Sequence, residues 1–430
     1  MIVLSASCIV RNNDEDHVLH LNGGNVCNSP AVSSPRGIAG FGLILITTTF
    51  LALCAFSPSR AASHRGSAYA SDTSSGNFKW TVDTLGADGS TLFDCCVVND
   101  SLAYAVGWIM PHDSAAQSHS LDWYNTAVWN GSRWTLMQVP VYFNNRKTFS
   151  PIHSVFARST DDVWFGMYYM VHWNGRKYLQ SDPYPRSFEN KIWESADGAR
   201  VYAVGDYGMI SYSPDHGKSW EPVRTGTPLQ FRDIWGDGGE VLAIASNNGG
   251  EECLVSLKGD SAVRLDDTFP FVQSLTGVWF VPNESYFLVG NGIYEAKSLK
   301  SKTWRFDPFI WHLNRYEAAV RGDGANDVFI AGEGGSIAHW NGATWRSYHS
   351  IENAPDQLRA VSVKDNLVVA VGQRYYNNLR NCGVVYMGFR HQTSLNSGSL
   401  PADQSAEVSH ENLVHDAAGG AVNRAGKEHN

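Results

Sequence analysis

The chain has 430 residues, of which 12% are aromatic and 40 are glycine, and its formal net charge is −9 at pH 7. The acidic balance excludes an overall basic surface that would neutralise phosphates, so we expect no nucleic-acid partner. Aromatic residues favour pleated sheets and glycines favour turns, so the composition indicates many short strands.

The N-terminal part of the chain is predicted to direct export. Residues 1–37 are polar and carry three acids at 14–16, so we also consider a translation start further downstream. Residues 38–56 form an uncharged apolar run that is long enough to enter a bilayer. The run predicts a signal peptide or an uncleaved signal anchor, and the sequence leaves the two open. We therefore expect a periplasmic, cell-surface or secreted protein, with membrane anchoring through 38–56 as one form. Cys54 follows Leu53, where lipoprotein processing needs a small residue, and this argues against a lipid anchor.

Two polar segments frame the rest of the chain. Residues 57–77 are rich in Ser, Ala and Gly and are predicted to form a flexible linker. Residues 391–430 have no apolar periodicity and are predicted to be a disordered tail. The remaining residues, 78–390, are predicted to form one domain.

Within 78–390 one pattern recurs: an apolar strand, a polar turn, a second strand that ends in glycine, and a hairpin that closes on an aromatic residue. The clearest copy spans 320–345. A period near 42 residues with strand-like alternation is typical of propeller blades. We predict an all-β fold with a single seven-bladed β-propeller, and we keep six or eight blades as alternatives. The expected innermost strands are anchored at Cys96, Val155, Ile192, Ile234, Val278, Val320 and Val361.

Three of the hairpins share an Asn-Gly pair, at 130–131, 174–175 and 341–342. An Asn-Gly pair predicts a type I′ turn, with positive φ at both residues. An aromatic residue stands four positions after each Asn, and we expect it to pack between blades.

The two ends of the domain complement each other. A strand at 78–82 carries Trp80 and precedes the first full repeat, whereas the last repeat ends near 387 without its outer strand. We predict that the N-terminal strand completes the last blade, which would leave no open edge.

The segment SPDHGKSW at 213–220 resembles the Asp-box of BNR-repeat proteins, a family of propellers that includes sialidases and photosystem II assembly-factor-like proteins. The resemblance concerns the fold over 78–390. It implies that the Asp-box residues build a turn and are not catalytic. These residues are Ser213, Asp215, Gly217 and Trp220.

Loops from every blade meet where the innermost strands begin, so propellers commonly bind ligands there. We predict a non-enzymatic scaffold that binds a protein or a glycan at this central mouth, and we expect it to be a monomer. A sialidase-like hydrolase, with Arg232, Arg321 and Arg359 as candidate arginines, is one alternative. The resemblance suggests another, an assembly factor for a membrane complex. The predicted mouth residues are Asp94, His153, Asn190, Arg232, Thr276, Glu317 and Arg359.

No cofactor or metal is expected. His172 and His339 occupy equivalent places in different repeats, and equivalent places in a ring lie far apart. The acidic loop at 323–327 lacks the glutamate that completes a calcium loop. A disulfide between Cys253 and Cys382 stays open, because spacing alone does not settle it.

Overall fold

The computed structural model describes residues 7–12, 15–20, 77–112, 122–183, 189–247, 250–265, 275–300, 304–307, 317–348, 355–377 and 380–391. The chain separates into two compact units, Met1–Arg65 and Gly66–Asn430. The predicted export run at 38–56, nearly all of the linker at 57–77 and the tail after residue 391 lie outside the described residues. No helix in the described part of the chain is long and apolar enough to cross a membrane.

The first unit contains one antiparallel hairpin. Strand β1 (Ser7–Asn12) pairs with β2 (Glu15–His20), with Asn12 opposite Glu15 at the turn.

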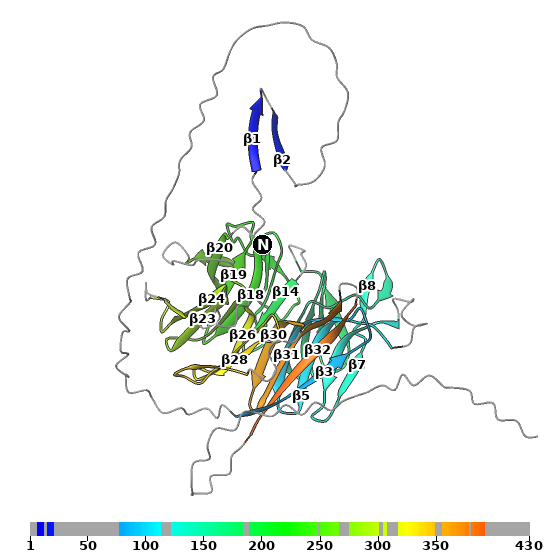
Figure 1. Cartoon of the computed structure of the whole chain (residues 1–430). Helices are drawn as coiled ribbons and strands as arrows, with labels where there is room; N and C mark the ends of the chain where they lie inside the picture. Colours follow the sequence, from blue (N-terminus) through cyan, green and yellow to red (C-terminus); the bar gives the residue numbers. More distant parts are fainter. Residues whose placement is uncertain are drawn as a thin grey trace, which may run out of the picture. The chain divides into compact units, whose positions relative to one another are not determined.

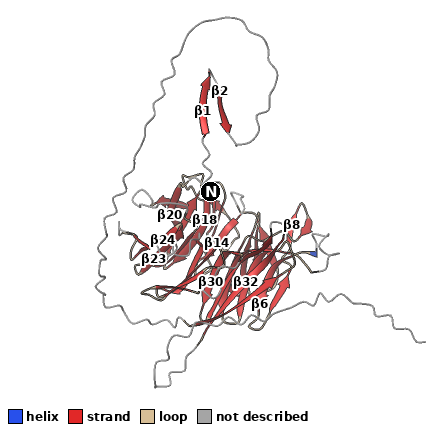
Figure 2. Cartoon of the chain, in the orientation of Figure 1, coloured by secondary structure: helices blue, strands red, loops and turns tan. Residues whose placement is uncertain are grey.

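The second unit is an all-β ring of seven four-stranded sheets, as the sequence predicted (Figures 1 and 2). We number these blades in chain order. Blades 1 to 3 contain β4 (Thr91–Asn99), β5 (Leu102–Ile109), β6 (Tyr124–Trp129) and β7 (Trp134–Met137); β10 (Ser154–Ser159), β11 (Asp162–Gly166), β12 (Met170–Trp173) and β13 (Tyr178–Ser181); and β14 (Glu189–Glu194), β15 (Val201–Gly205), β16 (Ile210–Ser213) and β17 (Glu221–Pro222).

The other four blades follow the same order from the inner to the outer strand. They contain β18 (Gln230–Asp237), β19 (Glu240–Ser246), β20 (Glu252–Lys258) and β21 (Ser261–Arg264); β22 (Gly277–Val281), β23 (Ser285–Gly290), β24 (Gly292–Ala296) and β25 (Arg305–Asp307); β26 (Glu317–Gly324), β27 (Asp327–Gly332), β28 (Ile337–Trp340) and β29 (Trp345–Ser347); and β30 (Asp356–Lys364), β31 (Leu367–Asn377), β32 (Arg380–Arg390) and β3 (Phe78–Leu85). All seven anchors predicted for the innermost strands lie in the innermost strands.

Blade 7 is closed by the start of the domain. Strand β3 pairs with β32 along its whole length, from Phe78 opposite Arg390 to Leu85 opposite Gly383. The indole of Trp80 is fully buried and packs edge-on against Tyr348 of blade 6, with 5.1 Å between the ring centroids. The predicted closure by the Trp80 strand is therefore confirmed.

Apolar side chains fill each boundary between neighbouring blades. The second strand of a blade is covered on both faces by the adjacent blades, which explains why β15 is buried over its full length. The aromatic residues that follow the Asn-Gly turns belong to these boundaries. Trp134, Tyr178 and Trp345 each pack in a cluster with residues of the preceding blade.

The backbone of the first strand approaches the glycine at the end of the second strand so closely that no side chain fits there. A Cβ atom on Gly107 would lie 2.1 Å from the carbonyl oxygen of Thr91, and one on Gly372 would lie 1.9 Å from that of Gln357. At both places the first strand carries a β-bulge that brings its backbone toward the glycine.

The Asn-Gly turns differ from the prediction. Among the described residues, positive φ occurs at the glycines, such as Gly131 with φ 87°, and not at the preceding asparagines. The side chain explains the difference, because Asn130 Oδ1 accepts hydrogen bonds from the backbone N–H groups of Ser132 and Arg133 at 3.1 and 3.0 Å. Asn174 and Asn341 do the same. The turns are therefore Asx-capped and not type I′.

The long spacing between the first two anchors contains a small hairpin of β8 (Val141–Phe143) and β9 (Arg146–Thr148). Cys253 and Cys382 are buried in different blades, 4 and 7, and no disulfide joins them.

Replacing Trp80 with alanine tests the closure. We expect Trp80→Ala to lower the free energy of unfolding by about 3–5 kcal/mol, because it leaves a cavity beside the closing strand. Trp108→Ala is the matched control, since the side chain of Trp108 is 37% exposed. Chemical denaturation of both variants checks the difference, and equal losses would show that β3 does not hold the ring closed.

Candidate functional site

The axis of the ring holds a cavity of about 340 Å³ lined by all seven innermost strands. Aromatic and aliphatic side chains line it together with charged ones, among them Asp94, Lys191 and Arg321. The first strands begin on one face of the ring, which we call the mouth face. The turns between second and third strands and the links between blades lie on the same face, because neighbouring strands are antiparallel.

Asp94 lies inside the cavity and not at its rim. It is 2% exposed, accepts a hydrogen bond from the backbone N–H of Val155 in blade 2 at 3.0 Å, and forms an ion pair with Lys191 of blade 3. A buried carboxylate needs such partners, since desolvation disfavours an unpaired charge.

Asp233 and Arg321 form the second pair, from blades 4 and 6. Two guanidinium nitrogens of Arg321 donate to the two carboxylate oxygens at 2.7 and 2.8 Å, and Asp233 also accepts from Val278 N–H at 2.9 Å. Burial alone would lower the pKa of Arg321, but the charge and hydrogen bonds of Asp233 raise it above its ordinary value. Arg321 is therefore a fixed structural cation.

The rim of the mouth contains an aromatic and cationic group from three blades. Phe93 of β4 stacks on His153, with 4.8 Å between ring centroids and 23° between planes. The guanidinium of the exposed Arg359 lies 5.9 Å from the centre of the Phe93 ring. Burial and the positive charge of Arg359 lower the pKa of His153, although Asp206 acts in the opposite direction.

Arg232 adds a fourth blade to this rim. Burial lowers its pKa, partly offset by the carboxylate of Asp206. Its Nε atom is buried and has no hydrogen-bond partner among the described residues. Gln230 of the same strand donates to Asp206.

For the other predicted mouth residues the structure gives the position along the strand or a backbone contact. Thr276 directly precedes β22, and its backbone N–H donates to the carbonyl of Val289 at 2.7 Å. Asn190 and Glu317 lie at the starts of β14 and β26, but their side chains are outside the described part.

The structure explains why the prediction chose Asp94 in place of Phe93. Phe93, Asn190, Arg232 and Arg359 are each the extra residue of a bulge in an innermost strand. In blades 3, 4 and 7 the predicted anchor stands two positions after this extra residue, so counting back two residues reaches it. In blade 1 the predicted anchor Cys96 stands three positions after Phe93, so the same count gives Asp94, one residue too deep.

Sequence reasoning missed a group of exposed aromatic residues on the mouth face. Tyr207 is 78% exposed in the turn between β15 and β16, and Trp108, Tyr168 and Tyr375 stand at corresponding ends of their second strands. Each of these aromatic residues comes one to three positions after the glycine at or near the end of its second strand. That spacing could have identified them from the sequence. Two further exposed rings, Tyr142 and Phe143, lie in the β8–β9 hairpin on the link between blades 1 and 2.

The side-chain hydrogen bonds of Ser213 and Asp215 stay within the Asp-box turn. Asp215 accepts from the Ser219 N–H at 2.8 Å, and Gly217 N–H donates to Ser213 Oγ at 2.7 Å. The bonds from Ser219 lower the pKa of Asp215. Trp220 donates through Nε1 to Ser181 Oγ of blade 2 at 3.2 Å.

His172 and His339 lie in separate blades, each with its own aspartate at 2.8 Å. In the acidic loop, Asp323 pairs with Lys364 and Asp327 with His339 and Arg390, so its carboxylates serve different partners. The described residues that gather enough donor atoms for a metal ion are Asp162, His172 and His216, between blades 2 and 3.

No protein-family model matches the sequence, and no curated protein sequence matches it. Solved propellers do match its fold. A structure described as YCF48 bound to D1 peptide is 15% identical with a TM-score of 0.54, over 72% of this chain and 96% of the other. YCF48 from Cyanidioschyzon merolae is 14% identical with a TM-score of 0.50, over 73% and 98%. The WD40 propeller domain of Doa1 is 11% identical with a TM-score of 0.51, over 74% and 98%. At these identities the likeness shows the propeller fold.

The Asp233–Arg321 pair can be tested by a double-mutant cycle. We expect Arg321→Met to cost about 3–5 kcal/mol, since it leaves a buried carboxylate without its cation. The double variant Arg321→Met with Asp233→Asn should be clearly more stable than Arg321→Met alone, because the amide oxygen still accepts from Val278. Urea unfolding measures both, and additive losses would contradict a direct pairing.

The lowered pKa of His153 predicts a pH dependence. Above the ordinary value of 6.5 neither the folded nor the unfolded state protonates this residue. As the pH falls below that value the unfolded chain takes up the proton first, so the folded state loses stability. We expect wild type to lose more unfolding free energy than His153→Gln between pH 7 and the lowered pKa. Parallel slopes for the two proteins would show that His153 is not perturbed.

Proposed function

We propose that this propeller is a non-enzymatic scaffold that binds a segment of another protein on its mouth face. The observation that carries the proposal is the gathering of exposed aromatic side chains on that face. Of the large hydrophobic side chains that are exposed in the described part of the chain, those off this face are Leu179 and Val263, on outer strands. Those on it belong to blades 7, 1, 2 and 3 and to the link between blades 1 and 2.

The chemistry of the rim supports a protein ligand. Aromatic residues and arginine are enriched in the cores of protein interfaces, because they offer a large contact area and donate hydrogen bonds. Phe93, His153 and Arg359 supply this combination at the axis, and Tyr207 and Tyr168 extend it outward. A surface of this composition suits an extended segment with apolar side chains and a carboxylate that faces Arg359 or Arg232.

The neighbours in fold point the same way. One of them is described as bound to a peptide of D1, and that description concerns YCF48. From it we propose for this chain only the mode of action, namely that the propeller holds a segment of another protein. An assembly factor would be one case of this mode of action. Membership of the BNR-repeat propellers and export through residues 38–56 are further parts of the proposal. They are supported by the Asp-box at 213–220 and by the apolar run.

The hydrolase alternative is less favoured by the geometry. A sialidase-like site would need its arginines to converge on one substrate carboxylate, whereas Arg321 is bound bidentately by Asp233 inside the ring. Arg359 lies at the rim beside Phe93. Arg321 therefore lies inside the ring and Arg359 at its rim, so the two do not converge on one substrate carboxylate.

Selection of peptides from a displayed library on the full-length chain tests the proposal. We expect Arg359→Ala and Tyr207→Ala each to weaken binding of the selected peptides by about tenfold or more, as for anchor residues of an interface. Binding is measured by titration calorimetry.

The chain offers matched controls for both variants. Arg133 is exposed in the Asn-Gly turn on the opposite face, and Val263 is 62% exposed on the outer strand β21. Arg133→Ala and Val263→Ala should leave affinity unchanged. Equal effects of control and mouth variants, or selective capture of glycans in place of peptides on a glycan array, would overturn the proposed function.

A further inference from the structure

The boundary between blades 2 and 3 differs from the other six in how it is filled. Its apolar cluster has five buried residues, whereas the clusters at the other boundaries have 9 to 14 in the described part of the chain. Polar side chains occupy the remaining space. They are Asp162, His172, Glu194 and His216, from both blades.

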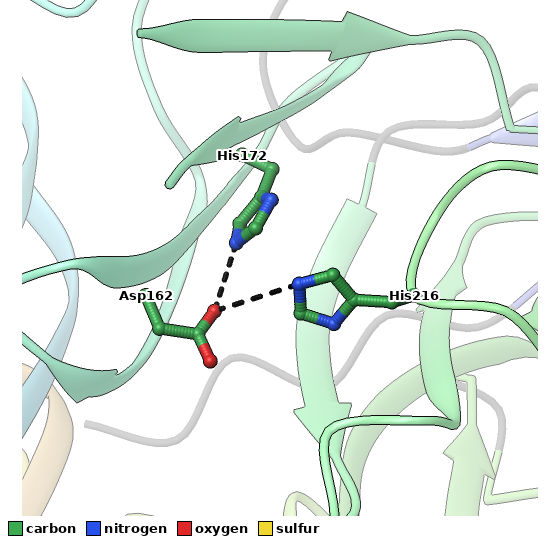
Figure 3. A group of neighbouring side chains, drawn as sticks. All are labelled: Asp162, His172 and His216. Atoms are coloured by element: carbon green, nitrogen blue, oxygen red, sulfur yellow. Dashed lines mark hydrogen bonds and ion pairs between the residues drawn. The ribbon is translucent and has the colours of Figure 1, made fainter. Parts of the chain in front are cut away.

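Three of these side chains converge on one point (Figure 3). Asp162 begins β11, and its Oδ1 atom lies 2.8 Å from Nε2 of His172 in β12. His216 reaches the same oxygen from the Asp-box turn of blade 3, with its Nε2 at 3.9 Å. The backbone φ of His216 is 58°, and the turn that imposes this angle also aims the imidazole across the boundary. The donor atoms of the three residues lie within 4.8 Å of one another.

The hydrogen-bond partners of Nδ1 decide which ring nitrogen of His216 carries the proton and which has a free lone pair. Its Nδ1 atom lies 2.7 Å from the carbonyl oxygen of Gly198 and 2.9 Å from Oε1 of Glu194. Both neighbours are acceptors, so Nδ1 carries the proton and Nε2 presents its lone pair toward Asp162. A carboxylate behind a histidine is the usual support of a metal-binding imidazole.

Glu194 is a buried acid that the surrounding residues do not fully satisfy. Its side chain is 0% exposed, Oε1 accepts from Trp164 Nε1 at 3.3 Å, and Oε2 has no hydrogen-bond partner among the described residues. A cation held by Asp162 and His216 would bring positive charge close to this buried side chain.

Blade 6 contains the same pair without the third donor. Asp327 and His339 are also 2.8 Å apart, and Phe329 stacks on His339 as Trp164 stacks on His172. There the carboxylate is neutralised by Arg390, which has no lone pair to offer a metal. The aspartate–histidine pair is therefore part of the repeat, and the imidazole of His216 is what distinguishes blade 2.

We propose that Asp162, His172 and His216 bind a divalent transition-metal ion of the Zn²⁺ class at the boundary between blades 2 and 3, with Glu194 orienting His216. Ligands of a tetrahedral zinc ion stand about 3.3–3.5 Å apart, given bond lengths near 2.0–2.2 Å. The 2.8 and 3.9 Å separations bracket this range. All three donor atoms lie within 4.8 Å of one another, so no pair has to close by more than about 1.5 Å. Two imidazole donors beside one carboxylate favour such ions over calcium or magnesium, which prefer all-oxygen ligands.

The remaining surroundings are compatible with this ion. Arg158 lies 3.6 Å from Oδ2 of Asp162 and leaves Oδ1 facing the two imidazoles. The side chains of Asp162 and His216 are 22% and 35% exposed, so solvent can supply a fourth ligand and a route for the ion. Bound metal would join the two blades where their apolar packing is least.

Zinc titration of the chelator-treated full-length chain tests the proposal by calorimetry and metal analysis. His216→Arg copies the arrangement of blade 6, and we expect it to remove one equivalent of bound Zn²⁺ while the circular dichroism stays unchanged. Glu194→Gln keeps all three donors and should weaken binding by about 10–100-fold. Zn²⁺ should raise the unfolding temperature of wild type and not that of His216→Arg.

His339→Gln in blade 6 is the matched control and should leave the stoichiometry and the affinity unchanged. It also shows whether the aspartate–histidine pair of blade 6 holds zinc by itself. The proposal is overturned if wild type retains no zinc in metal excess, or if His216→Arg and His339→Gln behave alike. Unaltered binding in both His216→Arg and Glu194→Gln would place the metal elsewhere.

Discussion

The pairing of β3 with β32 is the constraint on which the rest of the molecule depends. Each blade is a small sheet with two apolar faces, and it is stable only between two neighbours. A ring gives every blade two neighbours, but only if the last blade is complete. The N-terminal strand supplies the missing edge, so the full set of boundaries and the axial cavity exist as long as that one pairing holds.

Much of this architecture was predictable from local patterns. The period of the anchors, the glycine at the end of most second strands and the unmatched Trp80 strand are all visible in the sequence of the repeats. The φ angles of the Asn-Gly turns were not predictable in this way. The side-chain oxygen of Asn130 accepts hydrogen bonds from the backbone N–H groups of the turn, and this arrangement differs from a type I′ turn. Turn type depended on a side-chain contact and not on the dipeptide alone.

The candidate site was less predictable, for two physical reasons. The rim residue of blade 1 is the extra residue of a bulge, Phe93, and periodicity does not reveal which residue of a strand is bulged. The predicted anchor Cys96 was one residue too far along the strand, so the prediction gave the buried Asp94. Contacts between blades are also invisible within a repeat. The sequence presents His216 as a member of a turn, whereas its imidazole meets Asp162 of the preceding blade. Exposed aromatics such as Tyr207 were visible after their glycines, but their common face follows only from strand direction.

The ion pairs at the axis also bear on how such a protein can evolve. Asp94 reaches Lys191 two blades away, and Asp233 reaches Arg321 two blades away, so each pair spans a chord of the ring. Duplication or deletion of one repeat would change the length of those chords and leave charges buried without counterions. The two ion pairs therefore favour a constant number of repeats, and sequence change is accommodated more easily in the surface loops.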